Sequence, residues 1–244
     1  MAPSEPATPD QEQLAAWLRL APVLGLERIP WGSNAVFEAR LTTPGGEVRA
    51  IYKPARGERP LWDFPLGTLH RREVATSEVD RALGWGFTPL TVLRRQGPLG
   101  KGSMQEFIPD PLAELELDQS RIRHSLQGLA ALDVLLNNAD RKQAHLLIDP
   151  QGRVRGIDHG VTFHAEFKLR TALLELGGTE VPASWLADIR RLLQDPERLE
   201  RLGARLRQLL QPDEVDAFLA RARRLLRERA YPVLNQWYGR PFEW

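Results

Sequence analysis

A change of pattern part-way along the chain constrains the fold most. Residues 26–108 contain short apolar runs, partly β-branched and bounded by turns rich in Gly and Pro, as is typical of strands. From residue 120 onward most apolar residues recur with helical spacing, and Pro interrupts this spacing at positions 196 and 212. The sequence therefore predicts an α+β fold, with a small β-rich lobe over residues 11–108 and a larger helical lobe over residues 109–244.

The same patterns predict the individual elements of both lobes. In the β-rich lobe the expected helices span 11–20 and 68–83, and the expected strands span 26–29, 35–41, 48–53, 90–94 and 103–108. In the helical lobe, a long amphipathic helix is expected over 120–137, and a hairpin follows it with strands over 146–149 and 154–158. Further helices are expected after Pro182.

The composition excludes several classes of protein. The chain has 33 basic and 32 acidic residues, and its net charge of +1 gives no global attraction to nucleic acid or to an anionic membrane. The absence of Cys excludes disulfide scaffolds, zinc fingers, iron–sulfur centres and thiol nucleophiles. No uncharged apolar run approaches the roughly 18–20 residues that span a bilayer. We expect a cytoplasmic protein with no nucleic-acid partner and no stable membrane insertion, and a disordered, Pro-rich tail over residues 1–10.

Lysine is rare in this chain, which makes each lysine informative. Lysine stands only at positions 53, 101, 142 and 168, and the other 29 basic residues are arginine. Lys53 ends an apolar strand, and Glu73 on the following helix offers it a carboxylate partner. An ammonium held in this way places one positive charge on nucleotide phosphates, although a lysine at a strand end can also simply reach solvent. The turn over residues 31–34 offers the backbone N–H groups of Ser33 and Asn34 to the same phosphates, or is an ordinary hairpin turn.

Two aspartates carry the strongest chemical signal. Asp140 lies in the run Asn-Asn-Ala-Asp-Arg (137–141) after the long helix, and Asp158 lies in Ile-Asp-His-Gly (157–160) at the end of the hairpin. Because a hairpin returns the chain to its starting point, the two carboxylates should face each other. Paired carboxylates usually hold a divalent cation, and the second carboxylate can orient an attacking hydroxyl, as phosphoryl transfer requires. The Asn and Asp residues of the first run can also simply cap the helix or form an Asx-turn.

The order of four features resembles the pattern of the atypical kinases related to phosphatidylinositol 3- and 4-kinases, a group that includes HipA-type and secretory-pathway kinases. These features are Lys53, Glu73 and the runs 137–141 and 157–160. The stretches 52–75 and 138–145 are similar to those of a bacterial phosphatidylinositol 3-/4-kinase-like family, and the resemblance covers about residues 24–165. It implies a two-lobed protein-kinase-like fold and an ATP-dependent phosphotransferase with Mg²⁺ or Mn²⁺. The acceptor hydroxyl on a lipid headgroup, a protein or a small molecule is left open, as is the oligomeric state.

The resemblance also implies roles for individual residues. Lys53 would contact the nucleotide phosphates and act in catalysis, with Glu73 as its partner. Asp140 would be the catalytic aspartate, Arg141 would act in catalysis beside it, and Asp158 would bind the metal. The hinge for adenine would be formed by Gln105, Glu106, Phe107 and Ile108.

The chain departs from the family pattern at one site residue. His145 stands where the family has an Asn as second metal ligand, and imidazole suits Mn²⁺ or Zn²⁺ better than Mg²⁺. The departure therefore implies that His145 binds a softer metal together with Asp158, that it contacts substrate, or that the activity is reduced. Asn138 is a weaker substitute ligand.

Other readings of the same residues stay open. A pseudokinase would bind nucleotide without turnover, and an AMP transferase would use the same residues. A metal-dependent hydrolase would use a cluster of His145, Asp158, His159 and His164.

Two groups of arginines each allow more than one interpretation. We expect a solvated helix face at Arg221, Arg223, Arg224, Arg227 and Arg229, and either an anion site or a solubilising role at Arg56, Arg59, Arg71 and Arg72.

Overall fold

The computed structural model describes residues 10–30, 32–109 and 118–234. Most of the expected N-terminal tail and position 31 of the predicted turn lie outside these residues. The chain divides into two compact units: residues up to His70 together with Leu90–Phe107, and Arg71–Pro89 together with the chain from Ile108 onward. The predicted α+β fold is confirmed, with an antiparallel β-rich N-terminal part and a helical C-terminal part. No helix in the described ranges is both long and apolar enough to cross a bilayer.

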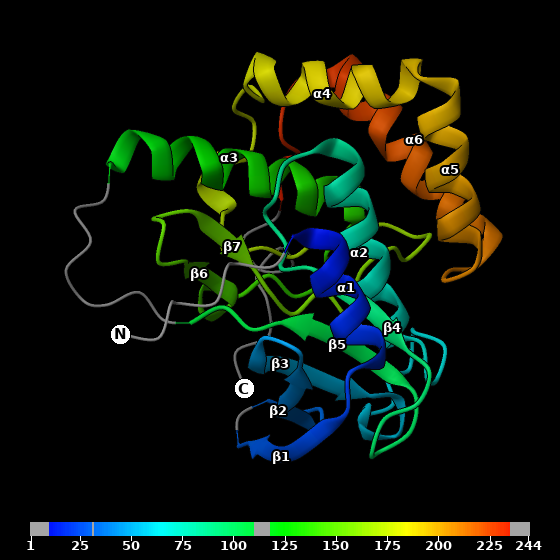
Figure 1. Cartoon of the computed structure of the whole chain (residues 1–244). Helices are drawn as coiled ribbons and strands as arrows, with labels where there is room; N and C mark the ends of the chain where they lie inside the picture. The colour runs from blue at the N-terminus through cyan, green and yellow to red at the C-terminus, as the bar shows by residue number, and fades with distance from the viewer. Residues whose placement is uncertain (1–9, 31, 110–117, 235–244) are drawn as a thin grey trace. The chain divides into compact units, whose positions relative to one another are not determined.

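The first unit is built on a five-stranded antiparallel sheet in the order β1-β2-β3-β5-β4 (Figure 1). Its strands are β1 (Val23–Ile29), β2 (Val36–Thr43), β3 (Gly46–Pro54), β4 (Thr91–Arg94) and β5 (Gly102–Glu106). They confirm the five predicted strands, with ends that differ by a few residues. Helix α1 (Gln11–Leu20) packs on this sheet and begins at Asp10, whose side chain accepts a hydrogen bond from the backbone N–H of Gln13.

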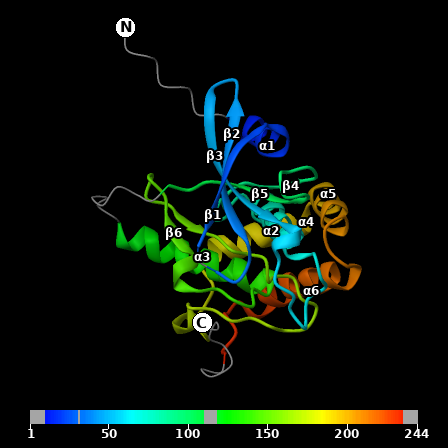
Figure 2. The same cartoon turned by 90° about the horizontal axis from the view of Figure 1, so that it is seen from below.

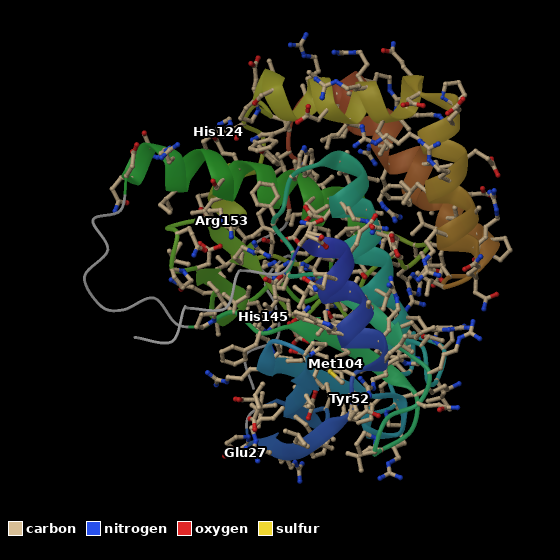
Figure 3. The ribbon with its side chains drawn as sticks, in the orientation of Figure 1. Glu27, Tyr52, Met104, His124, His145 and Arg153 are labelled. Atoms are coloured by element: carbon tan, nitrogen blue, oxygen red, sulfur yellow. The ribbon has the colours of Figure 1, made fainter. Side chains whose placement is uncertain are left out.

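The core of the first unit lies between α1 and the sheet. Figure 2 shows α1 beside the long strands β2 and β3. Leu18 of α1 is fully buried together with Leu41, Tyr52 and Met104 of the sheet, the last two of which are labelled in Figure 3. Because alternate residues of β3 point to opposite faces, Ala50 and Tyr52 reach this core. Lys53 pairs in register with Ser103 on β5.

The loop after β3 is held in place by a carboxylate. The first amides of helix α2 (Leu69–Leu83) have no partner within the helix, and Glu58 accepts hydrogen bonds from two of them, Leu69 N at 3.1 Å and His70 N at 2.8 Å. The ring of His70 lies 2.6 Å from the same carboxylate, and both side chains are almost fully buried. Burial raises the pKa of Glu58, but these hydrogen bonds together lower it by more than burial raises it. The pKa of Glu58 therefore lies below its usual value.

The second unit contains the rest of α2 and the helices α3 (Gln119–Leu136), α4 (Ala183–Gln194), α5 (Pro196–Arg207) and α6 (Pro212–Glu228). The hairpin of β6 (Leu146–Ile148) and β7 (Val154–Gly156) confirms the predicted one, and short 3₁₀ turns lie at Gln143–His145 and Leu174–Leu176. The predicted breaks before α5 and α6 are also confirmed, since a proline occupies the first turn of each helix, where its missing N–H costs nothing. Helix α6 contacts α3, α4 and α5, which Figure 1 shows gathered around it.

Two arginines of the second unit are withdrawn from solvent, contrary to the sequence-based expectations: Arg72 is buried and Arg221 is partly buried. Arg72 was expected to bind an anion or to solubilise a loop, but it is 1% exposed and forms an ion pair with Glu214. Arg221 was expected on a solvated face, but it donates to the carbonyl oxygens of Leu135 at 2.8 Å and His164 at 3.2 Å. Burial lowers the pKa of Arg221 to about 10. The other four arginines of that run are exposed, as expected.

Candidate active site

The run that follows α3 begins with a helix cap. Asn137 adopts the left-handed conformation (φ 54°, ψ 50°), which ends the helix and turns the chain away from its axis. Its side chain then fixes a distant segment: Nδ2 donates to the carbonyl oxygens of His164 at 2.9 Å and Glu166 at 2.6 Å, and Oδ1 accepts from Lys168 N at 2.8 Å. The capping role considered for this run therefore applies to Asn137.

Asn138 forms an Asx-turn that holds the backbone of Asp140. Its Oδ1 accepts from Asp140 N at 3.0 Å, and its Nδ2 donates to Asp133 Oδ1 at 2.8 Å. The side chain of Asn138 is fully buried, with both ends of its amide engaged. The oxygen of Asn138 faces the backbone of the loop, which does not favour the suggestion that Asn138 replaces the missing metal ligand; that suggestion stays a prediction.

The carboxylate of Asp140 has one engaged and one unengaged oxygen. Oδ2 lies 3.2 Å from Lys142 Nζ, whereas Oδ1 is buried without a hydrogen-bond partner among the described residues. Burial raises the pKa of Asp140. Lys142 opposes this shift, and the negative charge of Asp158 adds to it. The structure thus brings Asp140 and Asp158 close enough for their charges to interact, and Arg170 also acts on the same carboxylate.

Asp158 follows β7 with a positive φ of 59°. The 3₁₀ turn that carries His145 precedes β6, so the hairpin places His145 Nε2 3.4 Å from Asp158 Oδ2 (His145 is labelled in Figure 3). The backbone N–H of Lys142 faces Nδ1 of the same ring at 3.4 Å. A neutral imidazole that accepts at Nδ1 carries its proton on Nε2, and this proton then points at Asp158.

These side chains fit a divalent cation that arrives with phosphates. Within the described ranges no group of three or more His, Cys, Asp or Glu side chains is arranged to hold a metal. The cluster of four residues considered for a metal-dependent hydrolase is therefore not assembled. A cation held by one or two carboxylates and completed by substrate phosphates needs no larger protein cage, and the exposed carboxylate of Asp158 meets this requirement.

The side chain of Arg141 points into the fold and does not face a substrate. Its side chain is fully buried and forms a bidentate ion pair with Asp133 of α3, with both N···O distances at 2.9 Å. It also donates to the carbonyl oxygen of Ile157 at 2.8 Å and lies 2.6 Å from His159 Nε2. His159 is thus engaged with a guanidinium inside the fold.

The predicted nucleotide-binding residues are divided between the two units. Lys53, Gln105, Glu106 and Phe107 belong to the first unit with Ser33 and Asn34, whereas Glu73 and Ile108 belong to the second. The pairing of Lys53 with Glu73 stays a prediction.

Within the first unit several of these side chains have defined contacts. Asn34 Oδ1 accepts from Arg59 N at 2.7 Å, which ties the predicted phosphate turn to the loop after β3. Gln105 donates to the hydroxyl of Thr91 at 2.9 Å. Glu106 Oε2 accepts from Leu90 N at 3.1 Å.

Sequence reasoning missed two residues of this site. Lys142 was noted only as one of four lysines, although its position two residues after Asp140 was the available signal. Asp133 stands alone in the apolar helical run Leu-Ala-Ala-Leu-Asp-Val-Leu-Leu, and a lone carboxylate on a buried helix face signals a partner from elsewhere.

Solved structures of kinases have the same fold. The chain superimposes on the Golgi casein kinase with Mn/ADP bound (TM-score 0.61, 17% identity, 91% of this chain and 76% of that one) and on hydra Fam20 with sugar (TM-score 0.65, 15% identity, 92% and 90%). It is also similar to the Helicobacter pylori proinflammatory kinase CtkA (TM-score 0.53, 10% identity, 87% and 94%). The fold is therefore like that of these kinases.

Sequence comparison gives a nearer relationship. No family model matches the chain. Protein Rv2133c of Mycobacterium tuberculosis is 34% identical over an alignment 259 positions long, which covers 90% of each chain. At this identity and coverage, the chain belongs to the same family as protein Rv2133c.

Proposed function

We propose that this protein is an ATP- and divalent-metal-dependent phosphotransferase that acts on a hydroxyl group. The observation that carries the proposal is the buried Oδ1 of Asp140, an acceptor without a donor in the described part of the chain. A buried acceptor without a partner is costly, and such groups are often retained where a ligand completes them. A substrate hydroxyl that donates to this oxygen would be oriented for attack on a phosphate.

The neighbours of Asp140 suit this reaction. The ammonium of Lys142 lies 3.2 Å from Oδ2 of Asp140. Its positive charge would stabilise the negative charge that develops on the phosphoryl group during transfer. Asp158 is proposed as the ligand of Mg²⁺ or Mn²⁺, and the cation would neutralise charge on the nucleotide phosphates.

The role of His145 has two forms within this proposal. As a ligand it would bind through Nε2, which requires the proton to move to Nδ1, where the N–H of Lys142 already points. The geometry favours the other form, in which the ring donates to Asp158 and fixes the orientation of the metal-binding carboxylate.

The nucleotide contacts of the proposal come from the family resemblance. Lys53 with Glu73 is proposed to contact the phosphates, with the backbone at Ser33 and Asn34. The strand end Gln105–Ile108 is proposed to contact adenine. The likeness of fold to a Golgi casein kinase solved with Mn/ADP supports the choice of ligand. The finer assignment to the bacterial phosphatidylinositol 3-/4-kinase-like family is also a proposal, supported by the motifs within residues 24–165.

Product analysis tests the function and separates it from its alternatives. The protein is incubated with ATP and Mn²⁺ or Mg²⁺ together with lipid-headgroup, protein and small-molecule acceptors, and the nucleotide products are identified. We expect ADP and a phosphorylated acceptor from the wild type, and none from Asp140→Asn. The exposed carboxylate of Glu197 provides a control, since Glu197→Gln should not alter turnover. Pyrophosphate as product would instead identify an AMP transferase, and ATP binding without any product would identify a pseudokinase.

A further inference from the structure

The carboxylate of Asp133 is buried directly beneath the candidate catalytic loop. We propose that Asp133 is a positioning residue that fixes Asp140 relative to Asp158; this inference rests on the phosphotransfer function proposed above. Asp133 lies in the last turn of α3, and its side chain is fully buried. An ionised side chain in such a place is rare unless it is paired.

Both carboxylate oxygens of Asp133 are bound by the loop. Oδ1 accepts from Asn138 Nδ2 at 2.8 Å and from Arg141 Nη2 at 2.9 Å, and Oδ2 accepts from Arg141 Nε at 2.9 Å. A bidentate pair of this kind fixes the plane of the guanidinium as well as its position. One side chain of α3 therefore holds the loop on both sides of Asp140.

Asn138 and Arg141, the two residues bound by Asp133, in turn fix the backbone at both carboxylates of the site. Asn138 Oδ1 accepts from the backbone N–H of Asp140 at 3.0 Å, which fixes the backbone that carries the candidate catalytic side chain. Arg141 Nη1 donates to the carbonyl oxygen of Ile157 at 2.8 Å, directly before Asp158. The separation of the two carboxylates thus depends on one network of hydrogen bonds.

The main chain around the network is held at the same points. Ala139 N donates to the carbonyl oxygen of Val161 at 2.9 Å, and Arg170 N donates to that of Asn138 at 2.9 Å. These bonds fix the loop as a whole, but they do not set the direction of the Arg141 side chain or of the Asn138 amide. Among the described residues, Asp133 is the side chain that binds both of these groups.

Stability alone does not account for a charged pair at this place. The desolvation of two buried charges is often as large as their attraction, and well-packed apolar residues of similar volume commonly give equal or greater stability. Apolar residues cannot supply directional bonds to Asn138 and to the backbone before Asp158. The contribution expected from the pair is therefore geometric.

The test compares Asp133→Asn with a matched buried carboxylate. Asp80 is 2% exposed and accepts from Phe87 N and Thr88 N, and it has no bond to the catalytic loop among those described, so Asp80→Asn is the control. For each protein, kcat and KM for ATP are measured with Mn²⁺ per folded molecule, and amide hydrogen exchange is followed over residues 138–145 and 157–162.

We expect Asp133→Asn to lower kcat at least about tenfold, because misplacing a reacting group by an ångström can cost far more. KM for ATP should change by less than about threefold, since the metal and phosphate ligands are retained. Exchange should accelerate over both loop segments. Asp80→Asn should show neither effect on kcat nor on exchange in those segments.

A second variant separates geometry from folding. The paired replacement Asp133→Leu with Arg141→Met leaves no lone buried charge, so it should fold and still lose kcat. Either variant with wild-type kcat per folded molecule and unchanged exchange would overturn the inference. If the wild type transfers no phosphate to any acceptor, the proposed function fails, and the exchange comparison alone still decides whether Asp133 orders the loop.

Discussion

Arg72 provides a prediction whose size follows directly from the structure. Its side chain and that of Glu214 are 1% and 7% exposed, and the guanidinium also donates to the carbonyl oxygen of Thr162 at 2.5 Å. Arg72→Met should remove a buried cation and leave Glu214 buried, with the backbone N–H of Gln211 at 2.9 Å as its remaining donor among the described residues. Breaking a buried pair from one side typically costs about 3–5 kcal/mol. At about 2–4 °C per kcal/mol for a chain of this size, the melting temperature should fall by roughly 6–20 °C.

The pair can be isolated by a double-mutant cycle. In Arg72→Met with Glu214→Gln no charge is left alone, and most of the lost stability should return. The assay is urea unfolding followed by near-ultraviolet circular dichroism, with calorimetry for the melting temperature. Arg201→Met serves as the control, because its partner Glu197 is exposed and such a change should stay within about 0.5 kcal/mol. A single Arg72→Met variant that loses less than about 1 kcal/mol, or no more than the double variant, would refute the reasoning.

Three further predictions concern the loops and the strand end. Lys142→Met should lower kcat by about 10²–10³-fold, since it removes a charge beside Asp140, while melting temperature hardly changes because the pair is partly exposed. Lys53→Arg should fold normally but lose transfer by on the order of 10²-fold if the compact ammonium contacts phosphate, and full activity would remove Lys53 from the site. Because the folded-state pKa of Glu58 is lowered, its contribution to stability is present above a pH of about 4.5 and is lost as the pH falls through the lowered value. In Glu58→Gln the free energy of unfolding should therefore fall less steeply as the pH is lowered below about 4.5. Acid-unfolding curves of variant and wild type that run parallel would contradict the stabilisation of the Glu58 carboxylate by His70.

The elements of this fold could be predicted from sequence because their signals are local. Strand alternation, helical spacing and the prolines at 196 and 212 each act within a few residues, and all were found where expected. The approach of Asp140 to Asp158 was predictable for the same reason, since a short hairpin lies between them. The repetition of Asn at 137 and 138 was ambiguous, and the structure assigns a cap to one residue and an Asx-turn to the next.

Partners that are distant in sequence could not be predicted. Arg72 and Glu214 are separated by 142 positions, and nothing near either residue indicates that the two are buried together. Arg221 likewise donates to the carbonyl oxygen of Leu135 at the end of α3 and to that of His164, which a helical projection of α6 cannot reveal. Arg141 was expected to act in catalysis because of its place beside Asp140, but its guanidinium points into the fold at Asp133.

A crystal structure with a non-hydrolysable ATP analogue and Mn²⁺, with the metal located by its anomalous scattering, tests the central claim most directly. The account predicts Mn²⁺ bound by the carboxylate of Asp158 together with phosphate oxygens, and a γ-phosphate that faces Asp140. It also predicts that Asp158→Ala removes the anomalous peak. A metal bound away from Asp158, or a nucleotide that presents its α-phosphate to Asp140, would contradict phosphoryl transfer at this site.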